Sequence, residues 1–182
     1  ESSGNAAKDF YEQVLDFDER HDLVKPNGVW DLGSSEASEL AKLAETTYRD
    51  VNIGLANQFA RFAADNGIDV YSVIEACNSQ PFSHIHQPGI AVGGHCIPVD
   101  PFYLTWKAKE VDYPTKFIEL AGEINTMMPH YVVSKTVEAL NETGKSFKGA
   151  KILVLGIAYK KDVDDQRESP ALKIINLFKD KG

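Results

Sequence analysis

The sequence predicts a mainly helical central domain with long helices, flanked on both sides by partial α/β domains. Two long stretches, residues 34–66 and 115–143, carry apolar residues at three- and four-residue steps, which is typical of amphipathic helices. Short apolar runs at 28–32 and 151–156 are typical of strands. These patterns divide the chain into residues 1–33, 34–144 and 145–182.

The first long helix is the strongest element in the sequence. A short helix over residues 5–15 precedes it, with Phe10, Val14 and Leu15 on one side. Ser34 or Ser35 can cap the long helix. An apolar side of this length usually packs against another helix or a second subunit. That side consists of Leu40, Leu43, Ala44, Thr47, Val51, Leu55, Phe59 and Phe62.

Asn66-Gly67 predicts the end of this helix, and Asp69 predicts the cap of a shorter helix that runs to about Cys77. From residue 78 to residue 99 the periodicity stops, and a loop of this length is often functional. Asp100 as N-cap and Pro101 as the first helical residue predict a new helix.

A second long helix is expected after Pro114, with a kink near Pro129 and an end at Gly144. Ser169-Pro170 predicts the start of a last helix, to Lys181. The inward side of the second long helix is predicted to hold Ile118, Ala121, Ile124, Met128, Val132 and Leu140.

Composition and charge narrow the class of protein. The 43% hydrophobic and 25% charged residues are typical of a globular soluble chain, and the net charge of -8 argues against a nucleic-acid partner. Two cysteines make no disulfide framework, and we see neither a membrane span nor a signal peptide, so we expect a cytoplasmic protein. Both ends, Glu1 and Gly182, suggest cuts through a longer polypeptide.

The loop around Cys96 carries most of the chemical information. Cys96 follows Gly93, Gly94 and His95, and it stands four residues before Asp100. Glycines allow backbone N–H groups to approach a reacting centre, and a neighbouring cation or helix N-terminus favours a reactive thiolate. These features indicate a nucleophile.

Two other interpretations of the same loop stay open. Most free cysteines are small buried hydrophobes, and this is our interpretation of Cys77. A metal site could use His84, His86, His95 and Cys96, although no second cysteine stands at ligand spacing.

Four segments, in order and spacing, resemble the UDP-glucose/GDP-mannose dehydrogenase family of nucleotide-sugar 6-dehydrogenases. The first, SELAKLAETTYRDVNIGLANQ, is similar to the family's central dimerisation helix. GGHCIPVDPFYL resembles its active-site segment, and FIELAGEINTMMPHYVV resembles the helix that follows. GIAYKKDVDDQRESPAL resembles the start of its C-terminal, nucleotide-sugar-binding domain, which is Rossmann-like.

The resemblance implies an NAD-dependent oxidation of the sugar C6 hydroxyl to a carboxylate, through a thiohemiacetal and a thioester on Cys96. Lys42 matches the lysine that stabilises developing oxyanions, and Asp100 matches the aspartate that orients or activates water. Thr46 stands where the family commonly has an asparagine with an oxyanion role. The solvated helix charge for Lys42 and the N-cap for Asp100 are the plain structural alternatives.

The resemblance also implies binding residues for two ligands. Lys160 matches a residue that approaches the nucleotide sugar, Arg167 matches one that reaches the cofactor NAD, and Gly93, Gly94 and His95 are expected to line the substrate site. The arginine that many members offer across the dimer near residues 82–84 is absent, and His84 or His86 could replace part of its role.

The resemblance also predicts which sugar is oxidised and whether this chain is active alone. Val99-Asp100 resembles the UDP-N-acetylhexosamine branch, with UDP-N-acetylmannosamine as the first choice and UDP-glucose or GDP-mannose as alternatives. The rival from another class is a non-catalytic dimerisation module. Residues 1–33 would be the end of an NAD-binding domain, and the chain has no glycine-rich dinucleotide turn, so we expect this chain alone to be inactive.

Overall fold

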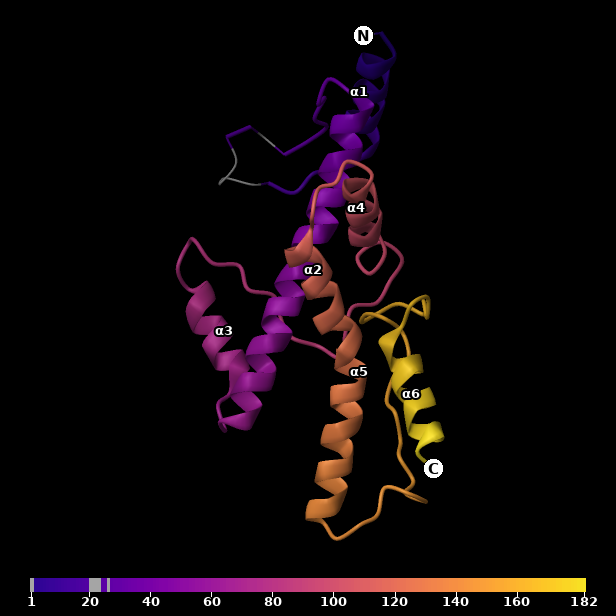
Figure 1. Ribbon diagram of the computed structural model, residues 1–182. Helices are drawn as coiled ribbons and strands as arrows, with labels where there is room; N and C mark the ends of the chain where they lie inside the picture. Colours follow the sequence, from indigo (N-terminus) through magenta and orange to yellow (C-terminus); the bar gives the residue numbers. More distant parts are fainter. Residues whose placement is uncertain (1, 20–23, 26) are drawn as a thin grey trace. The chain divides into compact units, whose positions relative to one another are not determined.

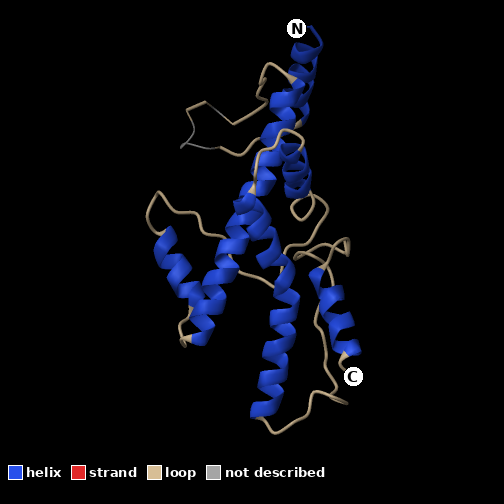
Figure 2. Ribbon diagram, in the orientation of Figure 1, coloured by secondary structure: helices blue, strands red, loops and turns tan. Residues whose placement is uncertain are grey.

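A computed structural model describes residues 2–19, 24–25 and 27–182. It divides into two compact units, residues 1–42 and 43–182. The described residues form helices joined by loops, with no strand among them (Figures 1 and 2). The helices are α1 (Ser2–Val14), α2 (Ser35–Asp65), α3 (Val70–Asn78), α4 (Asp100–Lys109), α5 (Lys116–Glu142) and α6 (Pro170–Asp180).

The first unit contains α1, a connecting segment and the first turns of α2. The helix predicted over residues 5–15 is confirmed, although it begins three residues earlier. Its apolar residues Phe10, Val14 and Leu15 are exposed. The strand predicted at residues 28–32 is wrong: these residues have no regular structure, since a strand needs a hydrogen-bonded neighbour and the described chain offers none.

The predicted start and end of α2 are confirmed. The Ser34 hydroxyl accepts a hydrogen bond from the Ala37 N–H at 3.1 Å, which satisfies one free donor of the first turn. Glu36 lies in this turn, where a hydrogen bond from its own backbone N–H lowers the pKa of its carboxyl. Gly67 adopts a φ of 65° just after the helix, a conformation that favours glycine.

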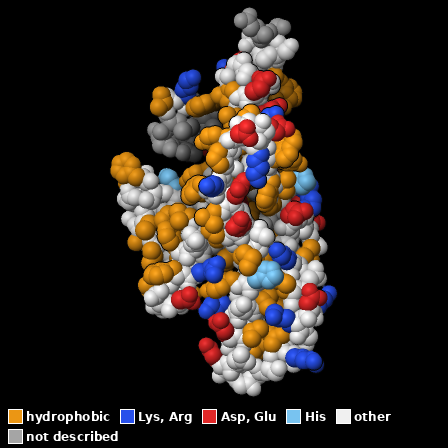
Figure 3. Space-filling model, in the orientation of Figure 1, with side chains coloured by type: hydrophobic (Ala, Val, Ile, Leu, Met, Phe, Trp, Pro, Cys, Tyr) orange, Lys and Arg blue, Asp and Glu red, His pale blue; other side chains and the backbone are white. Residues whose placement is uncertain are grey.

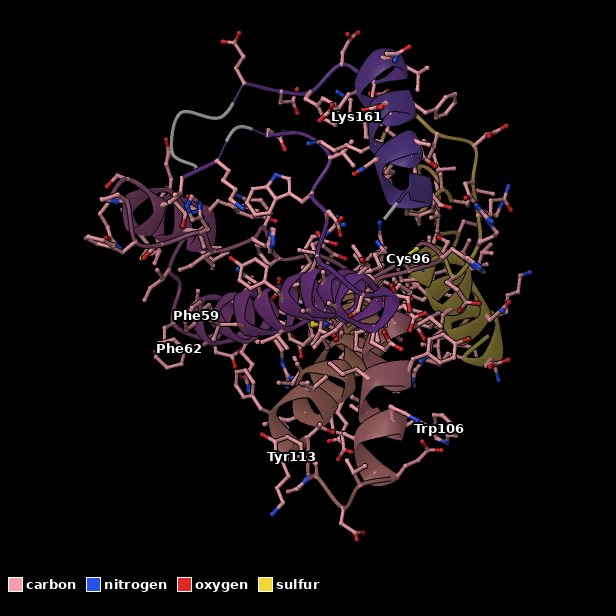
Figure 4. The ribbon with its side chains drawn as sticks, turned by 90° about the horizontal axis from the view of Figure 1, so that it is seen from above. Phe59, Phe62, Cys96, Trp106, Tyr113 and Lys161 are labelled. Atoms are coloured by element: carbon pink, nitrogen blue, oxygen red, sulfur yellow. The ribbon has the colours of Figure 1, made fainter. Side chains whose placement is uncertain are left out.

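The side of α2 that faces α5 carries small and polar residues rather than apolar ones. Asp50, Gly54 and Asn57 are buried on it. A Cβ on Gly54 would stand 3.2 Å from the Ala121 carbonyl oxygen, so the two helix backbones approach closely only because position 54 has no side chain. The predicted apolar side points elsewhere: Phe59 is 42% and Phe62 is 68% exposed, and both side chains project outward (Figure 4).

Helix α3 packs against the last turns of α2. The side chain of Asp69 caps it as predicted, since Oδ1 accepts a hydrogen bond from the Tyr71 N–H at 3.0 Å. A small apolar core lies between the two helices, and apolar side chains also lie on the surface over them (Figure 3). The core residues are Ala56, Ala63, Val70 and Ile74, with Ala60 and Ile85 packed against them.

Helices α4 and α5 follow the long loop predicted at residues 78–99. The predicted cap of α4 is wrong by one position: Val99 is the N-cap and makes no side-chain cap hydrogen bond, and Asp100 is the first helical residue. Helix α5 continues through Pro129, and Gly144 at φ 71° ends it as predicted. Of its predicted inward residues, Ala121 and Met128 are buried and the rest are half-buried.

Helix α6 lies alongside α5 (Figure 1), and the Lys173 Nζ donates to the Thr126 carbonyl at 3.3 Å. The predicted strand at residues 151–156 is wrong for the described chain: the segment pairs with no other strand, and Leu153 and Leu155 are exposed. The flanking α/β Rossmann-like domains are therefore not formed among the described residues. None of the helices in the described residues is long and apolar enough to cross a membrane.

Candidate active site

Asparagines on α2 and α3 fix the loop that leads to Cys96. Asn78 pairs with the backbone of Ile85 in both directions, accepting from its N–H and donating to its carbonyl, each at 2.8 Å. Asn52 donates to the His84 carbonyl at 2.6 Å and accepts from the His86 N–H at 2.8 Å. The amide groups thus substitute for strand partners, and the long loop is ordered without regular secondary structure.

Cys96 lies on a tight turn that begins helix α4. Its carbonyl accepts hydrogen bonds from the N–H groups of Val99 and Asp100 at 3.0 and 2.7 Å. This turn brings Asp100 back beside the backbone of Cys96, although three residues lie between them in the sequence. The Cys96 side chain is exposed and its thiol is free, whereas the other cysteine, Cys77, is half-buried on α3.

Gly93 and Gly94 form a close contact with the segment before α6. A Cβ on Gly93 would stand 2.7 Å from the Tyr159 Cβ, and a Cβ on Gly94 would stand 3.0 Å from the Tyr159 ring. Gly94 has a φ of 94°, and its N–H donates to the Arg167 carbonyl at 3.3 Å. Only glycine fits both positions, so the two glycines join the Cys96 loop to residues 159–167.

Arg167 forms a bidentate ion pair with Asp165 beside this contact. The Asp165 carboxylate accepts from the Arg167 Nε at 3.0 Å and from its Nη2 at 2.6 Å. These hydrogen bonds, followed by that from the Arg167 N–H, lower the pKa of Asp165 to about 2. The Arg167 side chain is 65% exposed, so the guanidinium is fixed in direction and still open to an anion.

No role was predicted from the sequence for Tyr159 or Asp165. The two-residue spacing between Asp165 and Arg167 was the available signal, because an aspartate can pair with a cation two residues on within a tight turn. Tyr159 and Gly93 are 66 positions apart in the sequence, so no local sequence pattern predicts their contact.

Lys160 and Lys161 line a cavity of about 610 Å³ together with Gly156 and Gln166. Lys160 is exposed, and so is His95 on the Cys96 loop. The structure thus brings the loop of Cys96 and the segment with Lys160 and Arg167 together in one unit.

Lys42 and Thr46 lie one turn apart on α2. Lys42 is exposed and is the last residue of the first unit. Thr46 belongs to the second unit and is fully buried, and its hydroxyl donates to the Leu43 carbonyl in its own helix at 3.2 Å. The oxyanion roles of Lys42 and Thr46 stay predictions.

The metal alternative gains no support from the geometry. Within residues 2–19, 24–25 and 27–182, no three or more His, Cys, Asp and Glu side chains gather as a metal site would require. His86 instead packs edge-on against Tyr48, with ring centroids 6.1 Å apart. Desolvation by burial, followed by the charges of Arg49 and His84, lowers the pKa of this imidazole.

The loop of the exposed Cys96, at the start of α4, is thus joined through Gly93 and Gly94 to the segment that bears Lys160 and Arg167. Residues 36–127 match the central domain of the UDP-glucose/GDP-mannose dehydrogenase family, and residues 153–182 match its UDP binding domain. The chain belongs to this family, as its motifs predicted.

Individual relatives agree with this placement. The chain is 45% identical over 148 residues to a UDP-N-acetyl-D-mannosamine dehydrogenase of Pyrococcus horikoshii, covering 81% of this chain and 35% of that protein. It is 38% identical to the enzyme of the same name in Methanocaldococcus jannaschii, covering 100% of this chain and 38% of that protein. A solved structure of the P. horikoshii UDP-D-ManNAc dehydrogenase aligns with a TM-score of 0.84 at 36% identity, covering 100% of this chain and 40% of that one. The chain thus spans little more than a third of the length of these relatives.

Proposed function

We propose that this chain is the central part of an NAD-dependent nucleotide-sugar 6-dehydrogenase that oxidises the C6 hydroxyl of its sugar to a carboxylate. The observation that carries the proposal is the exposed Cys96 on the turn before α4, joined through Gly93 and Gly94 to the segment of Lys160 and Arg167. Family membership and the relatives' names support the same activity.

The cysteine has a defined place in this chemistry. The C6 alcohol loses a hydride and a proton to give an aldehyde, and the Cys96 sulfur adds to the aldehyde carbon to form a thiohemiacetal. Loss of a second hydride and a proton leaves a thioester. Water attacks the thioester carbon, the C–S bond breaks, and the acid and the Cys96 thiol are released. A thiol suits these steps because it adds readily to an aldehyde and leaves readily from a thioester.

The neighbouring side chains would serve this thiol chemistry. Asp100, held beside Cys96 by the turn, would orient the attacking water. Lys42 would stabilise the oxyanions that form on the sugar, with Thr46 in the place of the family's asparagine. Lys160 would approach the nucleotide sugar, and Gly93, Gly94 and His95 would line its site.

Two molecules of NAD would accept the two hydrides, one each. From this chain, the exposed and directed guanidinium of Arg167 fits an anionic dinucleotide. A glycine-rich turn for the pyrophosphate would have to come from outside these 182 residues.

A UDP-sugar is the proposed substrate because residues 153–182 match the family's UDP binding domain. UDP-N-acetylmannosamine is the preferred sugar, since both relatives compared carry that name. UDP-glucose and GDP-mannose are the alternatives. The free thiols of Cys77 and Cys96 fit the reducing cytoplasm as the compartment.

A homodimer through α2 is the proposed assembly. The buried side of α2 that faces α5 carries small and polar residues, whereas Leu55, Phe59 and Phe62 are exposed on another side of the same helix. A second copy related by a two-fold axis would cover these side chains from both protomers.

A substrate panel tests the proposal. The complete polypeptide that contains this chain is incubated with NAD and with UDP-N-acetylmannosamine, UDP-glucose or GDP-mannose, and NADH is followed together with the acid product. We expect two NADH for each acid, fastest with UDP-N-acetylmannosamine. A folded dimer that oxidises none of the sugars would favour the rival, a non-catalytic dimerisation module.

A further inference from the structure

A chain of buried amide groups connects the loop before Cys96 to α2 and α5. The Gly89 N–H donates to the Asn57 Oδ1 at 2.9 Å, and the Asn57 Nδ2 donates to the Asn125 Oδ1 at 2.9 Å. The Asn125 Nδ2 donates to the Asp50 Oδ1 at 2.8 Å and to the Asp50 carbonyl at 2.9 Å. All donors point the same way, from the loop to the Asp50 carboxylate.

This hydrogen-bond chain lies in the interior, where Asn57 is 0% exposed and Asp50 and Asn125 are each 4% exposed. Apolar side chains of similar shape would fill the same space at little cost, so packing alone does not require amides here. An amide can accept from Gly89 and donate to Asn125 at once, whereas a carboxylate cannot donate and a leucine can do neither. The polar groups therefore specify where the loop backbone lies.

The loop backbone is strained just after the hydrogen bond between Gly89 and Asn57. Ala91 has a φ of 145°, in a region that residues with a Cβ rarely adopt, and such strain persists only where the surroundings hold the chain. Asn57 holds Gly89 two residues before it. Tyr159 and Arg167 hold Gly93 and Gly94, two and three residues after it.

We propose that Asn57 and Asn125 are positioning residues, which hold the strained loop so that the Cys96 thiol meets the sugar aldehyde. The proposal rests on the function proposed for Cys96 and goes beyond it. Neither asparagine touches the substrate: both act through the backbone between Gly89 and Gly94. Their loss should lower kcat and leave the KM for the nucleotide sugar unchanged.

The substitution Asn57→Asp tests this in the complete polypeptide that contains the chain. It keeps the size and the acceptor for Gly89 and removes the donor to Asn125. We expect kcat for acid formation to fall by about tenfold to about 100-fold, the loss expected when a reactive group is displaced by up to about 1 Å. The alkylation rate of Cys96 by iodoacetamide should change as well, relative to Cys77 in the same molecule.

Asn66→Asp is the matched control. It makes the same amide-to-carboxylate change just after α2, where the Asn66 Nδ2 donates to the Phe62 carbonyl of the last turns of that helix at 2.8 Å. It should keep kcat near the wild-type value. Ala91→Gly is the second variant, used if Asn57→Asp does not fold: it relieves the strained φ and loosens the loop without touching α2 or α5. It should fold at least as well as the wild type and still lower kcat.

Three results would overturn the proposal. One is an Asn57→Asp protein with wild-type kcat and wild-type Cys96 alkylation, and a second is an equal loss of kcat in Asn66→Asp. The third, where Asn57→Asp is unfolded, is an unchanged kcat in Ala91→Gly. If the wild type oxidises no nucleotide sugar, the proposed function fails, and the alkylation rate of Cys96 alone decides on the positioning role.

Discussion

The backbone N–H of Gly94 donates a 3.3 Å hydrogen bond to the carbonyl of Arg167, and so joins the cysteine loop to the segment that precedes α6. The two residues are 73 positions apart in the sequence. Figure 4 shows the consequence: Cys96 lies next to the C-terminal segment of the chain. A loop that the sequence identifies only by its residue types is thereby held against the segment with the proposed ligand-binding cations.

Gly94→Ala should disrupt this contact. The φ of 94° disfavours any Cβ, and the Cβ would press on the Tyr159 ring at 3.0 Å. We expect a loss of more than about 1 kcal/mol in the free energy of unfolding, because alanine is incompatible with the positive φ. Gly122→Ala on α5 is the control, since its Cβ would meet Phe102 at an ordinary 3.8 Å. Urea unfolding of both variants checks this, and equal stability of Gly94→Ala and wild type would contradict it.

The helices were predictable because their signals are local. The three- and four-residue spacing, the Asp69 cap and the glycines at 67 and 144 each act within one or two turns. The predicted strands failed because pairing depends on a second strand, which the described residues do not supply. An amphipathic pattern likewise defines an apolar side but not what covers it, so the pattern identified Phe59 and Phe62 and left open whether another helix or a second subunit packs against them.

The site was predictable only in part, for the same physical reason. GGHC marks a reactive loop by residue type, and Cys96 is indeed an exposed free thiol. The contacts of Tyr159 with Gly93 and of Asn57 with Gly89 join segments far apart in the chain, and no spacing in the sequence indicates them. Thr46 matches a motif position, yet the motif gave no sign that its side chain is fully buried.

Phe62→Asp should weaken the proposed dimer. Phe62 is exposed on the apolar side of α2, and a carboxylate there would have to be desolvated at a two-fold interface. Sedimentation at micromolar concentration should show a dimer for the wild type and a folded monomer for the variant. Tyr113→Ser, at an exposed aromatic residue in the α4–α5 loop, should stay dimeric. A monomeric wild-type protein would contradict the proposed homodimer.

The buried Asp50 should make stability depend on pH. Burial raises the pKa of its carboxyl, and the hydrogen bond from Asn125 acts in the opposite direction. The folded state therefore holds the proton more tightly than the unfolded chain, so this stabilisation is complete below the ordinary pKa of 3.8 and is lost as pH rises through the folded-state pKa. The Asp50→Asn variant has no carboxyl at this position to gain or lose a proton. Its stability relative to the wild type should increase from pH 4 to pH 7 in urea unfolding, and parallel curves would contradict the assignment.

The 182-residue chain alone should bind no NAD in the range typical of dehydrogenases. A pyrophosphate needs a glycine-rich turn at a helix N-terminus, and none occurs in this sequence. Calorimetry with NAD checks this directly. Turnover of any UDP-sugar by the purified chain would show that the cofactor site lies among these residues after all.

Acid formation by Cys96→Ser, in the complete polypeptide, tests the central claim most directly. An alkoxide leaves a carbonyl centre far less readily than a thiolate, so the variant should release no uronic acid while it stays folded and binds the nucleotide sugar. Cys77→Ser, at the half-buried cysteine of α3, should keep its activity. Mass spectrometry of the product from UDP-N-acetylmannosamine gives the answer. We predict acid from the wild type and from Cys77→Ser but none from Cys96→Ser, and wild-type amounts of acid from Cys96→Ser would contradict the account.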